Sequence, residues 1–221
     1  MMGRKIALWL LWAGFVTYIL LLAPPIEQDG QKLAQLAQEL ATGARAGLNP
    51  IILVLFNLVG IVLLTYSCLL FIDGRMQRVP VWPFVVASVA TGVIGLLPYL
   101  ALRETNQEFF GPKDILLNIL DSRWAGMILS LSTVGLLIYG LAAGDWGDFV
   151  YQFQTSRFVH GMSLAFCLLC LLFPTLLGDD MARRKLNKPQ VFWLVSLVPL
   201  LGPLAYLCLR PPLPESTTAL S

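Results

Sequence analysis

Residues 158–178 read FVHGMSLAFCLLCLLFPTLLG, and residues 179–185, which follow directly, read DDMARRK. The first stretch contains no acidic or basic side chain. An apolar stretch of about 18 residues or more is long enough to cross the ~30 Å hydrocarbon core of a bilayer as an α-helix. The stretch therefore predicts a transmembrane helix, and the charged residues after it predict an anchor at its C-terminal end.

The rest of the chain repeats this pattern. Hydrophobic residues make up 57% of the sequence and charged residues only 13%, whereas about a quarter of the residues of a soluble domain are charged. A charge at the centre of a transmembrane helix costs about 2.5–3.5 kcal/mol, and every Asp, Glu, Lys and Arg lies outside six apolar runs. We therefore predict an all-α polytopic membrane helix bundle, a single domain over residues 1–221, with six transmembrane helices. They are Ile6–Ala23, Pro50–Ile72, Trp82–Leu102, Trp124–Gly144, Phe158–Gly178 and Val191–Leu209.

Two segments between the runs have the pattern of short amphipathic helices on the membrane surface. In residues 31–44, leucines recur at helical spacing, a pattern that a loop helix packed on the protein explains equally well. After Asp145, a residue type that caps helices, apolar side chains follow the i, i+3, i+4, i+7 pattern. These side chains are Trp146, Phe149, Val150 and Phe153. The prolines after Arg210 cannot continue a helix, so we expect residues 211–221 to form a disordered tail.

The third and sixth runs end alike, with YLALR at residues 99–103 and YLCLR at residues 206–210. At the same offset before them, Asp73 aligns with Asp180. The chain therefore divides into two units of three predicted helices, residues 1–103 and 104–210. An odd number of spans reverses the direction of the chain, so we predict a 3+3 inverted repeat.

The positive-inside rule does not choose an orientation for this six-span topology. Arg4 and Lys5 favour a cytoplasmic N-terminus, whereas the basic residues at 183–188 would lie on the opposite side and favour the reverse.

His160 is the only histidine and lies about one turn inside the fifth run. A neutral imidazole within a membrane is a natural axial ligand for the metal of a macrocycle such as chlorophyll, so His160 is a candidate cofactor-binding residue. The alternative is a histidine bonded to water or to a neighbouring carbonyl. Cys167 and Cys170 have the C-x-x-C spacing, but within a membrane run we interpret them as packing residues and predict no metal site.

Two groups of residues are candidates for contact with lipid headgroups or a partner protein. The first is the basic group Arg183, Arg184 and Lys185, and the second is the aromatic group Trp146, Phe149 and Phe153. For the charged group, the alternatives are a divalent-ion site that includes Asp179 and Asp180, or a plain charged loop that pins the helix end.

Several of these stretches resemble an uncharacterised family of multi-span membrane proteins of cyanobacteria and plastids. The resemblance covers roughly residues 50–210 and lies in PVWPF at residues 80–84, LLPY at 96–99, SRFVHGMS at 156–163 and DMAR at 180–183. It implies a location in a thylakoid or bacterial inner membrane, but it brings no established activity or ligand residues.

The function that these observations favour is a non-enzymatic integral membrane protein. We expect a scaffold, subunit or assembly factor of a photosynthetic or other membrane complex, in contact with lipid and with chlorophyll or carotenoid as candidate pigments. A small secondary transporter with inverted repeats is the alternative, because prolines fall inside three of the runs. A lipid- or carotenoid-modifying enzyme is disfavoured by the lack of histidine clusters. The net charge of +2 and the lack of a basic, aromatic-interleaved stripe do not favour a nucleic-acid partner.

Overall fold

The computed structural model describes residues 2–24, 38 and 48–214, and the regular structure of these residues is helical. Four helical segments are long and apolar enough to cross a membrane. They are α1 (Met2–Leu21), α3 (Pro50–Gly74), α7 (Arg123–Ala143) and the segment Arg157–Arg183, which comprises α9 (Arg157–Leu172) and α10 (Pro174–Arg183). The all-α prediction is confirmed, and four of the six predicted spans have helices of membrane-spanning length.

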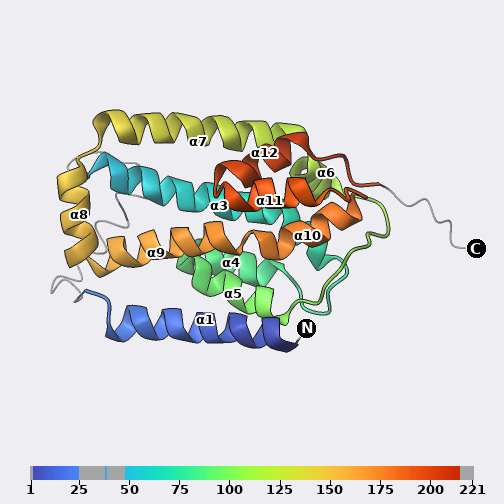
Figure 1. Ribbon diagram of the computed structural model, residues 1–221, viewed down its shortest axis with the longest axis horizontal. Helices are drawn as coiled ribbons and strands as arrows, with labels where there is room; N and C mark the ends of the chain where they lie inside the picture. Colours follow the sequence, from blue (N-terminus) through green and yellow to red (C-terminus); the bar gives the residue numbers. More distant parts are fainter. Residues whose placement is uncertain (1, 25–37, 39–47, 215–221) are drawn as a thin grey trace, which may run out of the picture.

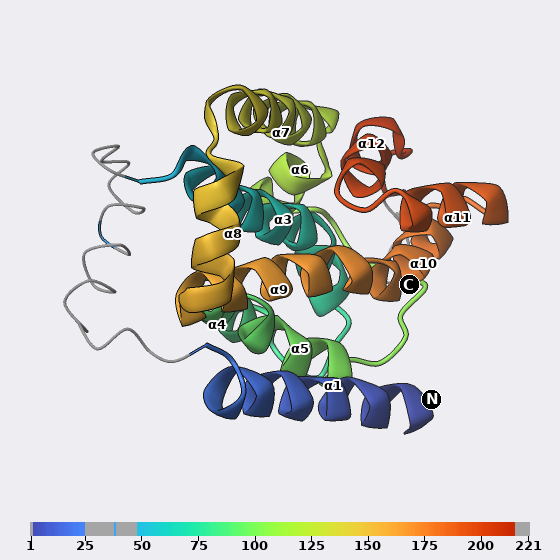
Figure 2. The same ribbon diagram turned by 60° about the vertical axis from the view of Figure 1, so that its left-hand side comes forward.

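Helices α3 and α9 form the centre of the bundle, with α7 on one side and α1 on the other (Figures 1 and 2). Tyr66 of α3 is buried, and its hydroxyl donates to the carbonyl oxygen of Leu169 at 2.7 Å. Its ring packs edge-on against Phe173, where the chain passes from α9 to α10. Helices α1 and α7 instead bury few of their large apolar side chains, as helices in contact with lipid do.

The predicted third span is wrong, because residues 82–102 form two short helices that pack against each other. They are α4 (Trp82–Thr91) and α5 (Val93–Leu102), and the turn between them is at Gly92, whose φ is +61°. Gly95 allows the close approach, since a Cβ there would lie 2.5 Å from the backbone of Ala87 and Ser88. The start of α4 and the side chain of Tyr99 in α5 both lie against Gly74, so this hairpin enters and leaves at one end of the molecule.

The predicted sixth span is wrong for the same reason. Residues 191–209 belong to α11 (Pro189–Leu197) and α12 (Leu201–Leu209), which contact each other and are joined by a turn in which Leu200 has a φ of +68°. A Cβ at Gly202 would lie 2.4 Å from the carbonyl oxygen of Val195, so the two helices again approach at a glycine. Each hairpin has about as many residues as a spanning helix and is as apolar. Composition and number of residues therefore did not distinguish a hairpin from a span.

The inverted repeat is also wrong. Each half contains two spanning segments followed by one hairpin, so each half crosses an even number of times and both halves run in the same direction (Figure 1). The charged turns after α3 and α10 consequently lie at the same end, where Arg183 pairs with Asp73 from the first half.

The opposite end of the molecule carries α8 (Trp146–Thr155), which crosses between α7 and α9 (Figure 1). This is the predicted second surface helix, and its cap is confirmed: Asp145 Oδ1 accepts from the N–H of Asp148 at 3.0 Å. The first predicted surface helix, residues 31–44, lies outside the described residues except for Gln38.

Two connecting segments lie at the charged end. The connection between the halves contains a short helix, α6 (Ile115–Asp121), which Asp114 caps through the N–H of Leu117. The tail prediction is wrong for residues 211–214, because Leu213 is buried and its N–H donates to Asp121 Oδ2 at 3.1 Å.

Candidate functional site: a paired charged cluster

The predicted site residues lie at two opposite ends of the bundle. Arg183, Arg184 and Lys185 are at the end where both hairpins begin, which we call the cluster end. Trp146, Phe149, Phe153 and His160 are at the other end, on α8 and the start of α9. The structure therefore does not bring the two predicted groups together.

The centre of the cluster end is Asp73, in the last turn of α3, which is completely buried. Tyr99 of α5 donates its hydroxyl to Asp73 Oδ2 at 2.8 Å. Arg103, directly after α5, binds both oxygens of the same carboxylate, at 2.9 Å through Nε and 2.7 Å through Nη2. One carboxylate thus fixes the C-terminal end of α5, where the first hairpin ends, to the last turn of α3.

Asp180 of α10 repeats this arrangement for the second hairpin. Tyr206 donates its hydroxyl to Asp180 Oδ2 at 2.7 Å, and Arg210 approaches the same oxygen at 3.4 Å. In both halves the tyrosine follows the aspartate by 26 residues and the arginine follows it by 30. The repeat that the sequence indicates is therefore a repeated contact, although its two copies are not inverted.

Arginines and aspartates from both halves join these two units into one cluster. Arg183 pairs with Asp73 and lies 3.8 Å from Asp180 Oδ1, so it bridges the two units. Arg103 pairs with Asp179, which forms a second link between the halves. Since Arg183 and Arg103 are both about 99% buried as side chains, these pairs are shielded from solvent.

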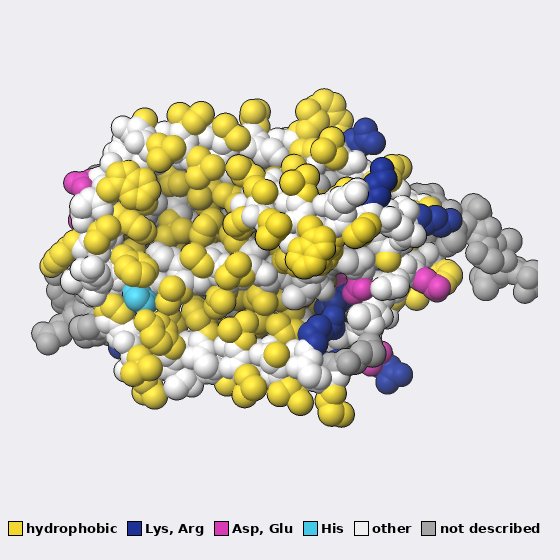
Figure 3. All heavy atoms as spheres, in the orientation of Figure 1, with side chains coloured by type: hydrophobic (Ala, Val, Ile, Leu, Met, Phe, Trp, Pro, Cys, Tyr) yellow, Lys and Arg dark blue, Asp and Glu magenta, His cyan; other side chains and the backbone are white. Residues whose placement is uncertain are grey.

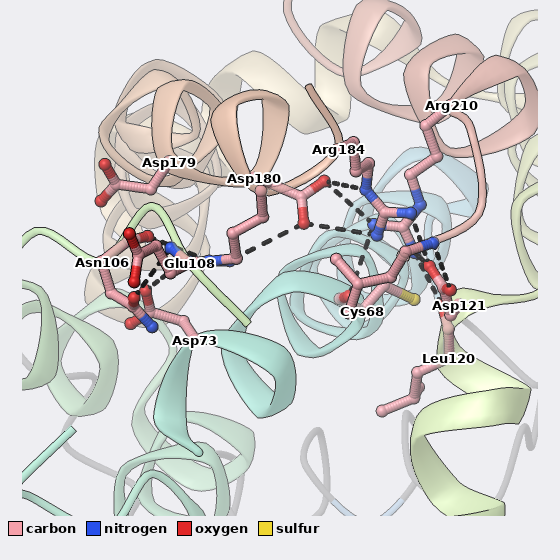
Figure 4. A network of polar contacts seen from close by, with 12 residues as sticks. Cys68, Asp73, Asn106, Glu108, Leu120, Asp121, Asp179, Asp180, Arg184 and Arg210 are labelled. Carbon is pink, nitrogen blue, oxygen red and sulfur yellow. Dashed lines mark hydrogen bonds and ion pairs between the residues drawn. The ribbon is translucent and has the colours of Figure 1, made fainter. Parts of the chain in front are cut away.

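Asp121, at the end of α6, extends the cluster toward residues 211–214, which follow α12 (Figure 4). Arg184 Nη1 lies 2.7 Å from Asp121 Oδ1, and Lys113 Nζ lies 3.0 Å from Oδ2. Figure 4 shows Arg184 and Arg210 converging on this carboxylate, and Arg210 also donates to the carbonyl oxygen of Leu120 at 2.8 Å.

Burial and ion pairing act on the pKa values of the cluster in opposite directions. Burial raises the pKa of Asp121, but the guanidinium of Arg184, the N–H of Leu213 and the guanidinium of Arg210 outweigh it, so the net pKa lies below the usual value. Burial lowers the pKa of Arg184, but Asp180 and Asp121 raise it above the ordinary arginine value. Both shifts keep the groups charged and paired near neutral pH.

The cluster therefore has a structural role, because it fixes the ends of the two hairpins to α3 and α10. Its carboxylates accept from arginines and tyrosines, and breaking one such buried pair by removing a partner typically costs about 3–5 kcal/mol. Four buried polar atoms have no partner in hydrogen-bond geometry within the described residues, although two of them, Asp121 Oδ1 and Arg183 Nη1, belong to ion pairs. The other two are Asn106 Nδ2 and Arg210 Nε. All four belong to the cluster or contact it.

At the opposite end, both ring nitrogens of His160 already have partners. Nε2 lies 2.9 Å from the hydroxyl of Tyr18, and Nδ1 lies 2.9 Å from the carbonyl oxygen of Phe153. A neutral imidazole has one N–H and one acceptor nitrogen, so a metal at Nε2 would have to displace Tyr18. Arg157 contacts the same helix end, donating to the carbonyl oxygen of Pro24 at 2.8 Å, so this contact fixes the end of α1 to α9.

The three aromatic residues of α8 divide into two roles. Trp146 is about half exposed and points away from the bundle, as an interfacial anchor does. Phe149 packs with Ile52 and Val159 in a small apolar cluster, and the ring of Phe153 lies 4.5 Å from the ring of His160.

Among the described residues there is no group of three or more His, Cys, Asp or Glu arranged to hold a metal ion. The four cysteines are free thiols, with Cys68 buried and Cys167 exposed on α9.

The pairing of Asp73 with Arg103, and the place of Asp121, were not predicted. In a six-span topology Asp73 and Arg103 fall on opposite sides of the bilayer and cannot meet. The equal spacing of aspartate, tyrosine and arginine in the two halves is the sequence signal that identifies the set.

Comparisons with known protein families, with curated protein sequences and with solved structures find no match for this chain.

Proposed function

We propose that this chain is a non-enzymatic integral membrane protein that serves as a subunit or assembly factor of a membrane complex. The observation that carries the proposal is the exposed tip of the hairpin α11–α12. Leu197 is 73% exposed there, and Val198 and Leu201 are also exposed.

The depth of this tip makes its exposure informative. A nine-residue helix is about 14 Å long, close to half of the ~30 Å hydrocarbon core, so the turn lies near the middle of the bilayer. The last carbonyls of a helix have no partner within it. Irregular backbone at membrane depth is tolerated where protein or a water-filled cavity covers it, and not where it faces lipid. We infer that a partner protein covers this turn.

The charged cluster supports this proposal because it makes the hairpin a rigid element. Asp180 holds Tyr206 and Arg210 at the end of α12, and Arg184 donates to the carbonyl oxygen of Pro211 at 2.6 Å. Trp193 and Leu194 of α11 face outward beside the tip. A pre-ordered apolar edge loses little conformational entropy when a partner helix binds it.

The resemblance to proteins of cyanobacteria and plastids makes the photosynthetic membrane the proposed location of this complex. A pigment would bind to another subunit of the complex or to an apolar helix face of this chain, because both ring nitrogens of His160 are hydrogen-bonded to Tyr18 and Phe153.

The experiment is site-specific photo-crosslinking in the native membrane. A photoreactive residue replaces Leu197 or Leu201 at the tip, and replaces Ile138 on the outward face of α7 as the matched control. We expect protein adducts from the tip positions and lipid adducts alone from position 138. Lipid adducts alone from all three positions would overturn the proposal, as would a purified protein that carries neither partner nor pigment.

A small transporter is the second candidate, because two hairpins that turn at mid-membrane depth also occur in transport proteins, some of which have parallel repeats. The buried carboxylates at the cluster end are engaged by arginine, which disfavours them as ion-coupling groups. Solute uptake into proteoliposomes distinguishes the two functions, since a subunit or assembly factor gives no flux.

A further inference from the structure

The topology places most of the positive charge of the protein at one end. Both hairpins begin and end at the cluster end, and α1 and α7 begin there (Figure 1). Twelve of the fifteen Lys and Arg residues of the sequence consequently lie at this end. They are Arg4, Lys5, Arg75, Arg78, Arg103, Lys113, Arg123, Arg183, Arg184, Lys185, Lys188 and Arg210. Figure 3 shows basic side chains gathered at this end, with apolar side chains over the body of the bundle.

The opposite end has little positive charge. Arg157 is the basic residue among the described residues there, and Lys32 and Arg45 belong to the chain segment that connects α1 with α3. Acidic residues do not cancel the difference, because the part of the chain that the structure describes has seven Asp and Glu residues at the cluster end against the twelve basic ones. The ends of spanning helices that are rich in Lys and Arg remain on the cytoplasmic side of a membrane. The cluster end therefore faces the cytoplasm, or the stroma in a plastid.

Within the described residues, seven of these twelve basic side chains have a hydrogen-bond or ion-pair partner; of the other five, Lys5 is half-buried and four are exposed. Arg78, Arg123, Lys185 and Lys188 are exposed, and no ion pair joins them to the described acidic residues. Each belongs to a turn or helix start at the cluster end. Lys185 stands at a positive φ of 55°, directly after the buried Arg184.

Exposed tryptophans accompany these cations at the same level. Trp82 and Trp124 lie in the first turns of α4 and α7, and each is more than 60% exposed. Tryptophan prefers the headgroup layer, and so do Lys and Arg at the ends of membrane helices. Together the four cations and two tryptophans form a belt at the cluster end, which we call the basic belt.

We propose that the basic belt binds the headgroups of anionic lipids in the cytoplasmic or stromal leaflet. The argument is charge complementarity: this leaflet is the negatively charged surface, and the belt is the uncompensated positive charge of the protein. The inference rests on membrane insertion alone, so it stands or falls separately from the partner proposed at the tip of α11–α12.

The binding experiment uses the full chain in phosphatidylcholine nanodiscs with or without 30% phosphatidylglycerol, a composition of about one anionic lipid in three. Native mass spectrometry of the released protein measures retained lipid. We expect preferential retention of phosphatidylglycerol, reduced roughly fivefold for each neutralised charge. The test variant is R78Q/R123Q/K185Q/K188Q, and the matched control is E104Q, which removes an exposed charge of opposite sign at the same end.

The outcomes separate specific binding from general effects. Loss of the preference in the quadruple variant, with the preference kept in E104Q and in excess inorganic phosphate, supports the proposal. An unchanged preference in the quadruple variant overturns it, and so does the absence of any preference in the wild-type chain. Equal thermal unfolding of both variants in pure phosphatidylcholine establishes that they fold.

A separate experiment tests which side of the membrane the cluster end faces. In a chain whose four cysteines are replaced by serine, Asn187→Cys reports the cluster end and Tyr151→Cys reports α8, since both positions are exposed. An impermeant thiol reagent added to intact cells should label position 151 and should reach position 187 only after permeabilisation. The reverse pattern would overturn the orientation.

Discussion

At the scale of single residues, Asp73 and Asp180 are the groups on which the two hairpins depend. Replacing either with Asn removes a charged partner from at least two buried guanidinium groups, and we expect a loss of about 3–5 kcal/mol in the free energy of unfolding. Tyr99→Phe and Tyr206→Phe remove one hydrogen bond to a charged group and should cost about 1.5–3 kcal/mol each. Reversible unfolding in detergent measures all four.

The control for these substitutions is Glu104→Gln, whose side chain is exposed and should change stability by less than about 0.5 kcal/mol. Since the two units have the same residue spacing and each aspartate pairs with at least two buried arginines, D73N and D180N should be similar in effect. A variant in which either aspartate is replaced at no cost would show that the cluster does not hold that hairpin.

Asp121 gives the cluster a pH dependence. Its pKa is lower in the folded protein than in the unfolded chain, so its stabilising contribution is complete above the unfolded value of about 4 and is lost as the pH falls through the folded value. We expect the thermal unfolding temperature to fall on acidification below about pH 4. The fall should be smaller in Asp121→Asn, which has no carboxyl to protonate. An identical pH profile for D121N and wild type would contradict this assignment.

At the scale of helices, Gly95 and Gly202 decide whether the hairpins can close. A Cβ at either position would overlap the backbone of the facing helix, so Gly95→Ala and Gly202→Ala should destabilise the protein by about 1–3 kcal/mol. Gly60→Ala and Gly135→Ala are matched controls, because a Cβ at either has nothing within 4 Å and alanine favours a helix. Equal unfolding curves for G95A and G60A would be inconsistent with the hairpin.

The same two hairpins mark the limit of what could be predicted from the sequence. The apolar runs correctly predicted the helices, and Asp145 correctly predicted the start of α8. Length and composition could not separate a span from two half-length helices, because both consist of about twenty apolar residues. The signal lies in the middle of each run, where Gly92 and the Val198-Pro199-Leu200 turn interrupt it.

That single error had consequences for the site. With residues 82–102 taken as a span, Asp73 and Arg103 lie on opposite sides of the bilayer, and the basic residues divide between both sides. With the hairpins in place, the aspartates and arginines at the equal offsets meet, and the charge asymmetry appears. The residue spacing was visible in the sequence, but its meaning depended on the direction of two short helices.

At the scale of the whole molecule, the two halves should behave as separable units joined by the cluster and by the contacts of α3 with α7 and α9. Tyr66 reaches Leu169 across this boundary, as do the pairs Arg103–Asp179 and Arg183–Asp73. We expect co-expressed fragments 1–107 and 108–221 to assemble and to co-purify in mild detergent, because the cut falls at exposed residues between the hairpin and α6.

The cluster should govern how tightly these fragments associate. Arg183→Ala removes the residue that pairs with Asp73 across the boundary, so it should reduce the recovered complex by at least about tenfold, which corresponds to 1.4 kcal/mol or more and lies below the cost expected for a broken buried pair. Gln190→Ala, an exposed position in α11, should leave recovery unchanged. If the fragments failed to associate, or if R183A associated as well as Q190A, the bridging role of Arg183 between two parallel halves would be refuted.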